Sequence, residues 1–217
     1  MIRSELRDRL LDAVNDAGAV FTTTDQANAL IDECLEVVAE ETEAVRRTAY
    51  VALQPGVTYY HLRAVAPDAM APIRIWLEHS RRRLNAVTMR ELDQRHILWQ
   101  QTTGEPWDWF PLSWDWFGIW PKSATGGHLL RVDYWAWPTG LLDDTDQPEL
   151  LEADHDPLVP QYGVYSVAAK RWDAKGTVDA WARFKQMAGL TKGRTNVRPG
   201  DVTGRSADIQ FFNGVRG

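Results

Sequence analysis

The spacing of apolar residues predicts a helix at the beginning of the chain. Its narrow apolar stripe consists of residues that stand four apart, namely Ile2, Leu6, Leu10 and Val14. A glycine just past the last periodic residue is typical of a helix end, so this helix is expected to end near Gly18.

A second helix has the most distinct N-terminal signal in the sequence. Thr23 and Gln26 have the spacing of a capping box, in which the threonine hydroxyl accepts from a backbone amide while the glutamine side chain reaches back. The apolar residues that then follow the helical period are Ala27, Leu30, Ile31, Cys34, Leu35, Val38 and Val45. Two helices are therefore expected to open the fold.

The central part of the chain has the alternation and turn residues of β structure. Two β-prone runs in 50–62 flank a turn at Pro55-Gly56, and a third run covers 73–84. Residues 117–120 and 129–137 add two strands joined by a turn at 123–127, and a short helix is expected around 89–95. We expect an antiparallel sheet from about 48 to 140.

The helical period returns after an acidic loop. One helix is traced by Pro160, Tyr162, Tyr165, Ala169 and Trp172. Gly176 is expected to break it, and a further helix should end near Gly189; it is traced by Val178, Trp181, Phe184 and Ala188. Residues 193–217 contain several glycines and little periodicity, so they are expected to form an extended arm.

This order of elements predicts an α+β fold with an insertion. The helices at both ends, within residues 1–47 and 157–192, should pack together as one helical bundle. Residues 48–156 should form an inserted, Trp-rich antiparallel β domain, and residues 193–217 an extended C-terminal arm.

Composition and charge narrow the function. A net charge of -6 argues against a general nucleic-acid binder, which needs clustered Lys and Arg to contact phosphates. The charge is unevenly distributed along the chain. Residues 141–156 hold seven acids and no Lys or Arg, and residues 192–217 hold five basic residues and two acids. The lone Cys34 and five scattered histidines provide neither a disulfide nor metal-ligand spacing, so no metal or cofactor is expected. The charged beginning is unlike a signal peptide and no run reaches the roughly 18 apolar residues of a membrane span, which predicts folding in a reducing cytosol.

Eight of the eleven tryptophans lie between Trp99 and Trp137. A core of one small sheet needs fewer large aromatics, so some of these rings are expected to contact a partner. Four carboxylates stand among them, namely Glu105, Asp108, Asp115 and Asp133. Glycoside hydrolases use two carboxyl groups beside a sugar, but Asp alternating with Trp equally fits a strand, and no nucleophile elbow, phosphate loop or metal spacing accompanies these acids.

Besides a glycoside hydrolase, two kinds of binding protein would account for the tryptophans. Exposed tryptophans stack on sugars, as in carbohydrate-binding modules, but such modules are usually wholly β and this chain has helices at both ends. Trp, Tyr and Arg are also the residues enriched at the energetic centres of protein interfaces, and an Arg-bearing arm with Phe211 and Phe212 is typical of a segment that orders on a partner. The assembly interpretation accounts for more of the chain.

The order of motifs resembles the head-to-tail adaptor, or connector, proteins of tailed bacteriophages. The similarity covers roughly residues 2–190, and its most specific part begins at Trp99 and continues through TGEP at 103–106. An IWP strand end, a strand over 134–138 and the sequence DQPEL before a helix with repeated tyrosines follow.

The resemblance implies a structural virion protein without enzymatic activity or cofactor. Such a protein would form a homo-oligomeric ring, a dodecamer in the family, at the head-to-tail junction, after assembly in the host cytoplasm. Its partners would be further copies of itself, the portal protein above and the next tail or stopper protein below, with no membrane. DNA would pass through the lumen without sequence-specific binding. A Trp-rich carbohydrate-binding or minor tail (host-recognition) module is the alternative.

Three sets of residues are assigned on this basis. The portal-docking arm would use Arg194, Arg198, Arg205, Phe211 and Phe212. The subunit or tail interface would use Trp107, Trp109, Trp114, Trp116 and Trp120. The lumen-facing acidic loop would present Asp143, Asp144, Asp146 and Glu149. By strand parity Trp114, Trp116 and Trp120 should share one face and Phe117 and Ile119 the other, with one face uncovered in an isolated subunit.

Overall fold

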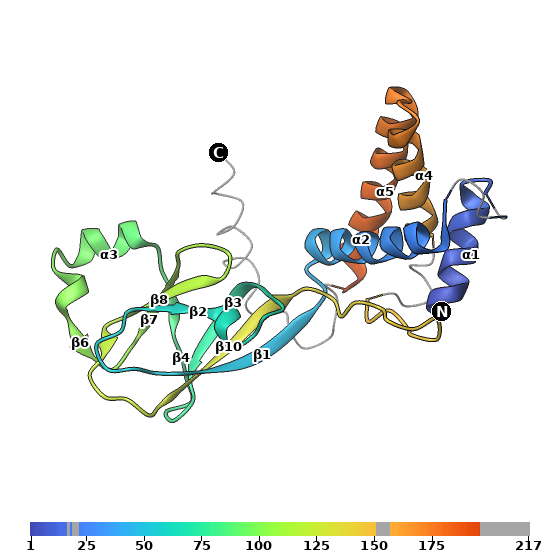
Figure 1. The fold of residues 1–217 in the computed structure, drawn as a ribbon. Coiled ribbons are helices and arrows are strands. Elements are labelled where there is room, and N and C mark those ends of the chain that lie inside the picture. Colours follow the sequence, from blue (N-terminus) through green and yellow to red (C-terminus); the bar gives the residue numbers. More distant parts are fainter. Residues whose placement is uncertain (17, 19–21, 151–156, 196–217) are drawn as a thin grey trace. The chain divides into compact units, whose positions relative to one another are not determined.

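The computed structural model describes residues 1–16, 18, 22–150 and 157–195. It has mixed α+β structure and divides into two compact units, a helical unit and a β unit (Figure 1). The helical unit takes Met1–Val45 and the described residues from Pro138 onward, and the β unit takes Arg46–Trp137. The predicted class, a bundle of N- and C-terminal helices with an inserted β domain, is confirmed.

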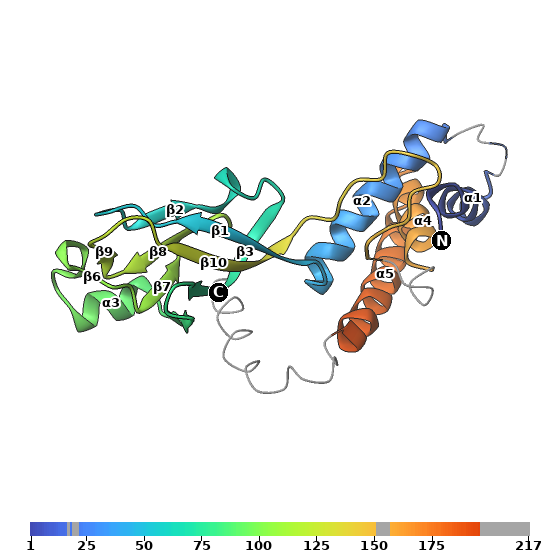
Figure 2. The ribbon, with the colours of Figure 1, turned by 90° about the horizontal axis from the view of Figure 1, so that it is seen from below.

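Over its described residues the helical unit contains four helices (Figure 2), and their apolar side chains form one core. They are α1 (Arg3–Ala13), α2 (Thr24–Thr42), α4 (Leu158–Lys170) and α5 (Ala174–Thr195). Their apolar faces meet around fully buried side chains, among them Leu6, Leu10, Ile31 and Phe184. Over the described residues, no helix has the length and apolar character needed to cross a membrane.

The predicted capping box of α2 is confirmed. The hydroxyl of Thr23 accepts from the amide of Gln26 at 3.3 Å, and the Gln26 side chain accepts from the amide of Thr23 at 3.2 Å. The helix ends at Thr42, because Glu43 adopts a left-handed conformation with φ 53°. Val45, which the apolar spacing had included in this helix, lies beyond its end and is buried.

The predicted helix break at Gly176 is wrong. The chain turns earlier, at Trp172, whose φ is +59°. Gly176 lies in the first turn of α5, where its amide donates to Oδ1 of Asp173 at 2.9 Å. The cap from Asp173 stabilises the start of α5, so the helix accommodates Gly176 in its first turn. At its other end α5 continues past Gly189, where it was expected to end, to Thr195.

The β unit contains two four-stranded sheets and one short pair. The first sheet has the order β1-β10-β3-β4, formed by Arg46–Ala52, Leu129–Ala136, Ala69–Leu77 and Arg82–Arg83. The second has the order β2-β8-β7-β5, formed by Tyr59–His61, Trp116–Trp120, Asp108–Pro111 and Asn85–Ala86. The pair consists of β6 (Thr103–Gly104) and β9 (Lys122–Ser123). Helix α3 (Met89–Arg95) confirms the short helix, and two 3₁₀ turns cover Leu62–Ala64 and Trp99–Gln101.

The predicted strands exist, but the expectation of a single sheet is wrong. The two runs around Gly56 become β1 and β2, which belong to different sheets, and β8 and β10 are likewise separated. Strand β2 instead pairs with β8, which places Tyr60 opposite Phe117 with the rings stacked at 5.6 Å. Burial of these aromatic faces, and not proximity along the chain, selects the strand partners.

A cluster of buried apolar residues in the β unit forms around Phe110. It contains Val87, Leu92, Trp99 and Phe110, so α3 covers this face of the second sheet through Leu92. Gly118 makes the packing possible, because a Cβ at this position would lie 2.2 Å from the Phe110 ring.

Candidate interaction surfaces

The acidic loop is fastened to the start of α1 by backbone hydrogen bonds. The amides of Arg3 and Ser4 donate to the carbonyls of Asp146 and Asp144 at 2.9 and 3.1 Å. The loop therefore belongs with the helical unit. The sequence had predicted a β domain over residues 48–156, which would have included this loop.

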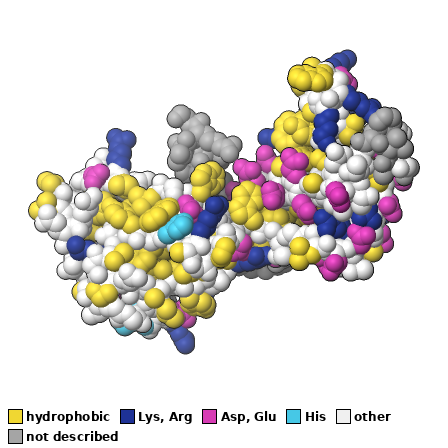
Figure 3. All heavy atoms as spheres, in the orientation of Figure 1, with side chains coloured by type: hydrophobic (Ala, Val, Ile, Leu, Met, Phe, Trp, Pro, Cys, Tyr) yellow, Lys and Arg dark blue, Asp and Glu magenta, His cyan; other side chains and the backbone are white. Residues whose placement is uncertain are grey.

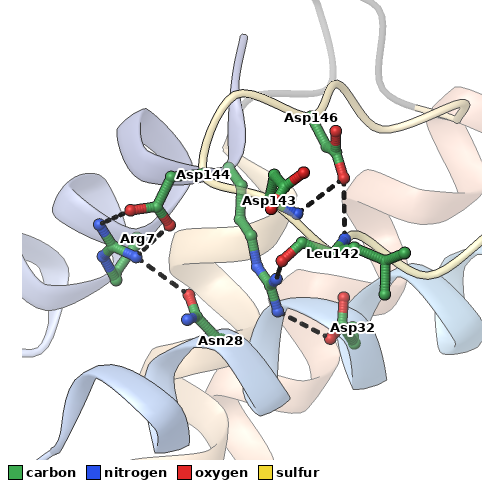
Figure 4. A network of polar contacts seen from close by, with 8 residues as sticks. Arg7, Asn28, Asp32, Leu142, Asp143, Asp144 and Asp146 are labelled. Carbon is green, nitrogen blue, oxygen red and sulfur yellow. Dashed lines mark hydrogen bonds and ion pairs between the residues drawn. The ribbon is translucent and has the colours of Figure 1, made fainter.

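Two arginines of α1 reinforce this attachment (Figure 4). The buried Arg3 guanidinium donates to the Leu142 carbonyl at 3.0 Å and to Oδ2 of Asp32, on α2, at 3.1 Å. Arg7 forms a bidentate pair with Asp144 at 2.6 and 3.1 Å. We call these contacts the arginine clamp. Sequence reasoning missed both arginines, because nothing local links residues that stand 137 and 139 positions from their partners.

Contacts within the fold engage two carboxylates of the acidic loop and lower their pKa values. The hydrogen bond from Arg7 lowers the pKa of Asp144. Backbone amides of Asp143 and Leu142, at 2.9 and 2.8 Å, lower the pKa of Asp146 by binding its carboxylate. Asp144 and Asp146 thus have roles within the fold, and Asp143, Asp144 and Glu149 are exposed to solvent. The remaining acids of the predicted loop, in 151–156, lie outside the described residues.

The five tryptophans assigned to an interface differ in exposure. Trp107, Trp114 and Trp116 are 57%, 59% and 41% exposed, but Trp109 is only 4% exposed and is a core residue. Trp120 is partly buried, since its ring stacks on His96 at 4.6 Å and its Nε1 donates to the Trp99 carbonyl at 3.0 Å. Figure 3 shows hydrophobic side chains gathered on one face of the β unit.

The exposed rings fall at two ends of the β7–β8 hairpin. Trp114 and Trp116 lie at its turn, where Trp116 stacks on His61 at 4.8 Å. Trp107 lies at the opposite end, where its amide donates to the carbonyl of Trp120. Parity holds within the strand, because Phe117 and Ile119 are fully buried while Trp116 is exposed. The tryptophan face is not wholly uncovered, since Trp120 packs against the Phe110 cluster.

The four carboxylates among the tryptophans each have structural partners. Asp108 is buried and accepts from Asn85 at 3.0 Å, and Glu105 pairs with Arg82 at 3.2 Å. Asp115 accepts from His61 at 2.8 Å, which lowers the pKa of this carboxyl. The contacts of Asp133, which is also buried, are with Thr48, Arg131 and Arg74.

These environments suit ion pairs and structural hydrogen bonds better than catalysis. A general acid needs a raised pKa, whereas the hydrogen bond from His61 lowers the pKa of Asp115. Among the described residues no group of three or more His, Cys, Asp or Glu side chains could hold a metal ion.

Most of the predicted docking arm lies outside the described residues. Arg198, Arg205, Phe211 and Phe212 lie outside the described residues. Arg194 falls in the last turns of α5, so the helix extends into what the sequence analysis assigned to the arm.

Comparison with known proteins adds one finding. A family model described as SU10 adaptor protein matches residues 1–205. No curated protein matches the chain.

Proposed function

The chain belongs to the SU10 adaptor protein family, a family of phage head-to-tail adaptors, and from this premise we propose that it forms a ring beneath the portal. The ring, a dodecamer, joins the capsid to the tail and continues the DNA channel. The observation that carries the proposal is the family match over residues 1–205 of a 217-residue chain. The family is structural, and we propose that this member likewise has no enzymatic activity.

A ring needs two different surfaces on each copy. In a heterologous contact one surface of a subunit binds another surface of its neighbour, and rotation closes the series. The exposed tryptophans of the β7–β8 hairpin are proposed as a contact with a neighbouring subunit or with the tail protein. Trp107, Trp114 and Trp116 have the exposure this requires, and Trp120 is partly accessible. Trp109 is withdrawn from this set because it is buried.

The acidic loop is proposed to face the lumen. Its exposed Asp143, Asp144 and Glu149 would repel DNA phosphates, so DNA would pass without being held. The arginine clamp supports this role because it holds the loop in a defined position on α1 and α2. A structure of the assembled ring with residues 141–149 on the outer rim would remove the assignment.

The portal contact is proposed to lie in the C-terminal arm. Arg194, Arg198 and Arg205 would pair with acidic portal groups, and Phe211 and Phe212 would be apolar anchors. A chain lacking residues 193–217 should fold and fail to bind purified portal. Unchanged binding by this deletion would refute the assignment.

The function as a whole is tested by genetic removal of the chain from a producing infection. The expected result is separate accumulation of DNA-filled heads and of tails, restored to joined particles by the full chain supplied in trans. Normal joined particles without the chain would contradict the proposal. A purified chain that stays monomeric and binds oligosaccharide with quenched tryptophan fluorescence would favour the carbohydrate-binding alternative.

A further inference from the structure

The turn between α4 and α5 has a tryptophan where a helix normally ends with glycine. The amide of Trp172 donates to the Ala169 carbonyl and that of Asp173 to the Ala168 carbonyl, both at 3.1 Å. These are the two hydrogen bonds of a Schellman ending, and Trp172 occupies its left-handed position with φ +59°. A side chain with a Cβ is disfavoured in this conformation, which is why glycine predominates there.

Trp172 obtains no compensating side-chain contact from the part of its unit that the structure describes. It is 93% exposed, and its indole makes no hydrogen bond or ring contact with the described residues. The other tryptophan of this hairpin, Trp181, packs on Phe184 at 5.3 Å and on Tyr165 at 4.8 Å. An unfavourable backbone conformation together with an unused aromatic ring points to a role outside the isolated subunit.

Basic side chains surround this tryptophan. Lys170, Arg171 and Lys175 are exposed and form no ion pair with the described residues. Asp173 is occupied in capping α5. We call Lys170, Arg171, Trp172 and Lys175 the hairpin tip; it lies at the projecting end of α4 and α5 in Figure 1, and Figure 3 shows hydrophobic and basic side chains there.

The same unit presents a surface of opposite charge on α2. Glu36 and Glu40 stand one helical turn apart, are exposed, and have no ion-pair partner among the described residues. Glu41, by contrast, is paired with Lys185 at 3.1 Å. Residues 1–45 as a whole contain eleven acidic and three basic residues, and Figure 3 shows acidic side chains gathered over α2.

We propose that the hairpin tip of one copy docks on the Glu36–Glu40 face of α2 in a second copy. The Trp172 indole is the apolar anchor, and the cations of the tip pair with the two glutamates. The partly exposed Val37 gives the indole apolar surface beside these acids. Because the two surfaces differ, the contact is heterologous and repeats from copy to copy. The inference rests on the proposed ring and names the surfaces that form it.

Replacing Trp172 by glycine separates an interface role from a folding role. The W172G variant relieves the left-handed strain, so its thermal midpoint should not fall, while self-association of the full chain in sedimentation velocity should weaken at least about tenfold. Ile97→Gly is the matched control, because Ile97 is also 93% exposed but lies in the β unit, and it should associate like the wild type. Wild-type association by W172G would overturn the proposal.

A charge exchange identifies the receiving surface. Reversal of the tip (Lys170→Glu with Arg171→Glu) and reversal of α2 (Glu36→Lys with Glu40→Lys) should each abolish association. A chain carrying all four substitutions should regain association in large part, because the two reversed tip residues again face residues of opposite charge on α2. Loss of association with the tip reversal, and no effect of the α2 reversal, would show that the tip binds a different acidic surface of the chain and would contradict this assignment.

The proposed adaptor function fails under a different observation. It is refuted if the wild-type chain is absent from the necks of purified particles. The docking inference is refuted if the wild-type chain is present there and self-associates, but W172G and the charge-reversed chains do so equally well.

Discussion

Truncation of Arg3 tests the arginine clamp most sharply. The Arg3→Ala variant removes hydrogen bonds from a buried guanidinium to the Leu142 carbonyl and to the Asp32 carboxylate. Hydrogen bonds to charged groups contribute about 1.5–3 kcal/mol each, and the part exposure of Asp32 lets water replace some of that loss. We expect the free energy of unfolding of the helical unit to fall by about 3 kcal/mol, a large fraction of the roughly 5–15 kcal/mol of a typical domain.

Urea unfolding followed by far-UV circular dichroism measures this loss. Arg3→Met separates packing from charge, because it retains apolar volume while leaving Asp32 unpaired, so it should lose most of the same stability. Arg9→Ala, an exposed change on the same helix, should cost less than about 1 kcal/mol. Limited proteolysis should also cut residues 141–149 faster in the Arg3 variants. A cost for Arg3→Ala no larger than that for Arg9→Ala, with an unchanged cleavage rate, would refute the clamp.

The same clamp predicts a pH dependence. The pKa values of Asp144 and Asp146 are lowered in the folded chain by Arg7 and by backbone amides. A carboxyl whose folded pKa is depressed stabilises the fold above its unfolded pKa, about 4, and this stabilisation is lost as the pH falls through the folded value. Attachment of the loop to α1 should therefore weaken below about pH 4. In the Asp144→Asn variant, attachment should change less with pH, because one of the titrating carboxyls is absent. Protection of the loop amides from hydrogen exchange that stays constant down to about pH 2.5, about 1.5 units below the ordinary carboxyl pKa, would contradict the prediction.

Three further changes address the interior. Gly118→Ala should destabilise the β unit by about 1–3 kcal/mol in urea unfolding, because its Cβ would overlap the Phe110 ring at 2.2 Å; equal midpoints would refute this packing. Trp109→Ala should cost about 3–5 kcal/mol and Trp107→Ala less than about 1, since the first ring is buried and the second exposed; similar losses would contradict the distinction. The Cys34 thiol, whose pKa is raised by burial, should react with a disulfide reagent at pH 8 only after unfolding, and rapid labelling of the native chain would contradict its burial.

Local signals in the sequence predicted the helices well where side chains act on their own backbone. The Thr23–Gln26 capping box is one such case, since all its atoms lie within one turn. The break assigned to Gly176 was wrong for a related reason: glycine has a low helix propensity, but the cap from Asp173 outweighs it. The actual turn falls on Trp172, a residue type that gives no such signal.

Pairing and exposure over long distances were beyond local patterns. Alternation located the strands but did not show that β1 and β2 would join different sheets, because each finds its partner far along the chain. Trp107 and Trp109 have the same parity, yet only Trp109 lies within a strand and is buried. The arginine clamp joins α1 to loop residues more than 130 positions away, and no motif marks either partner.

The account's central claim is that this chain is the adaptor between head and tail. Cryo-electron microscopy of the neck of the phage that encodes it tests that claim most directly. The predicted result is a closed ring of this chain immediately below the portal, with the helical and β units fitting the density as separate bodies. Density for a different protein at that position, with this chain absent from the neck or found elsewhere in the tail, would contradict it.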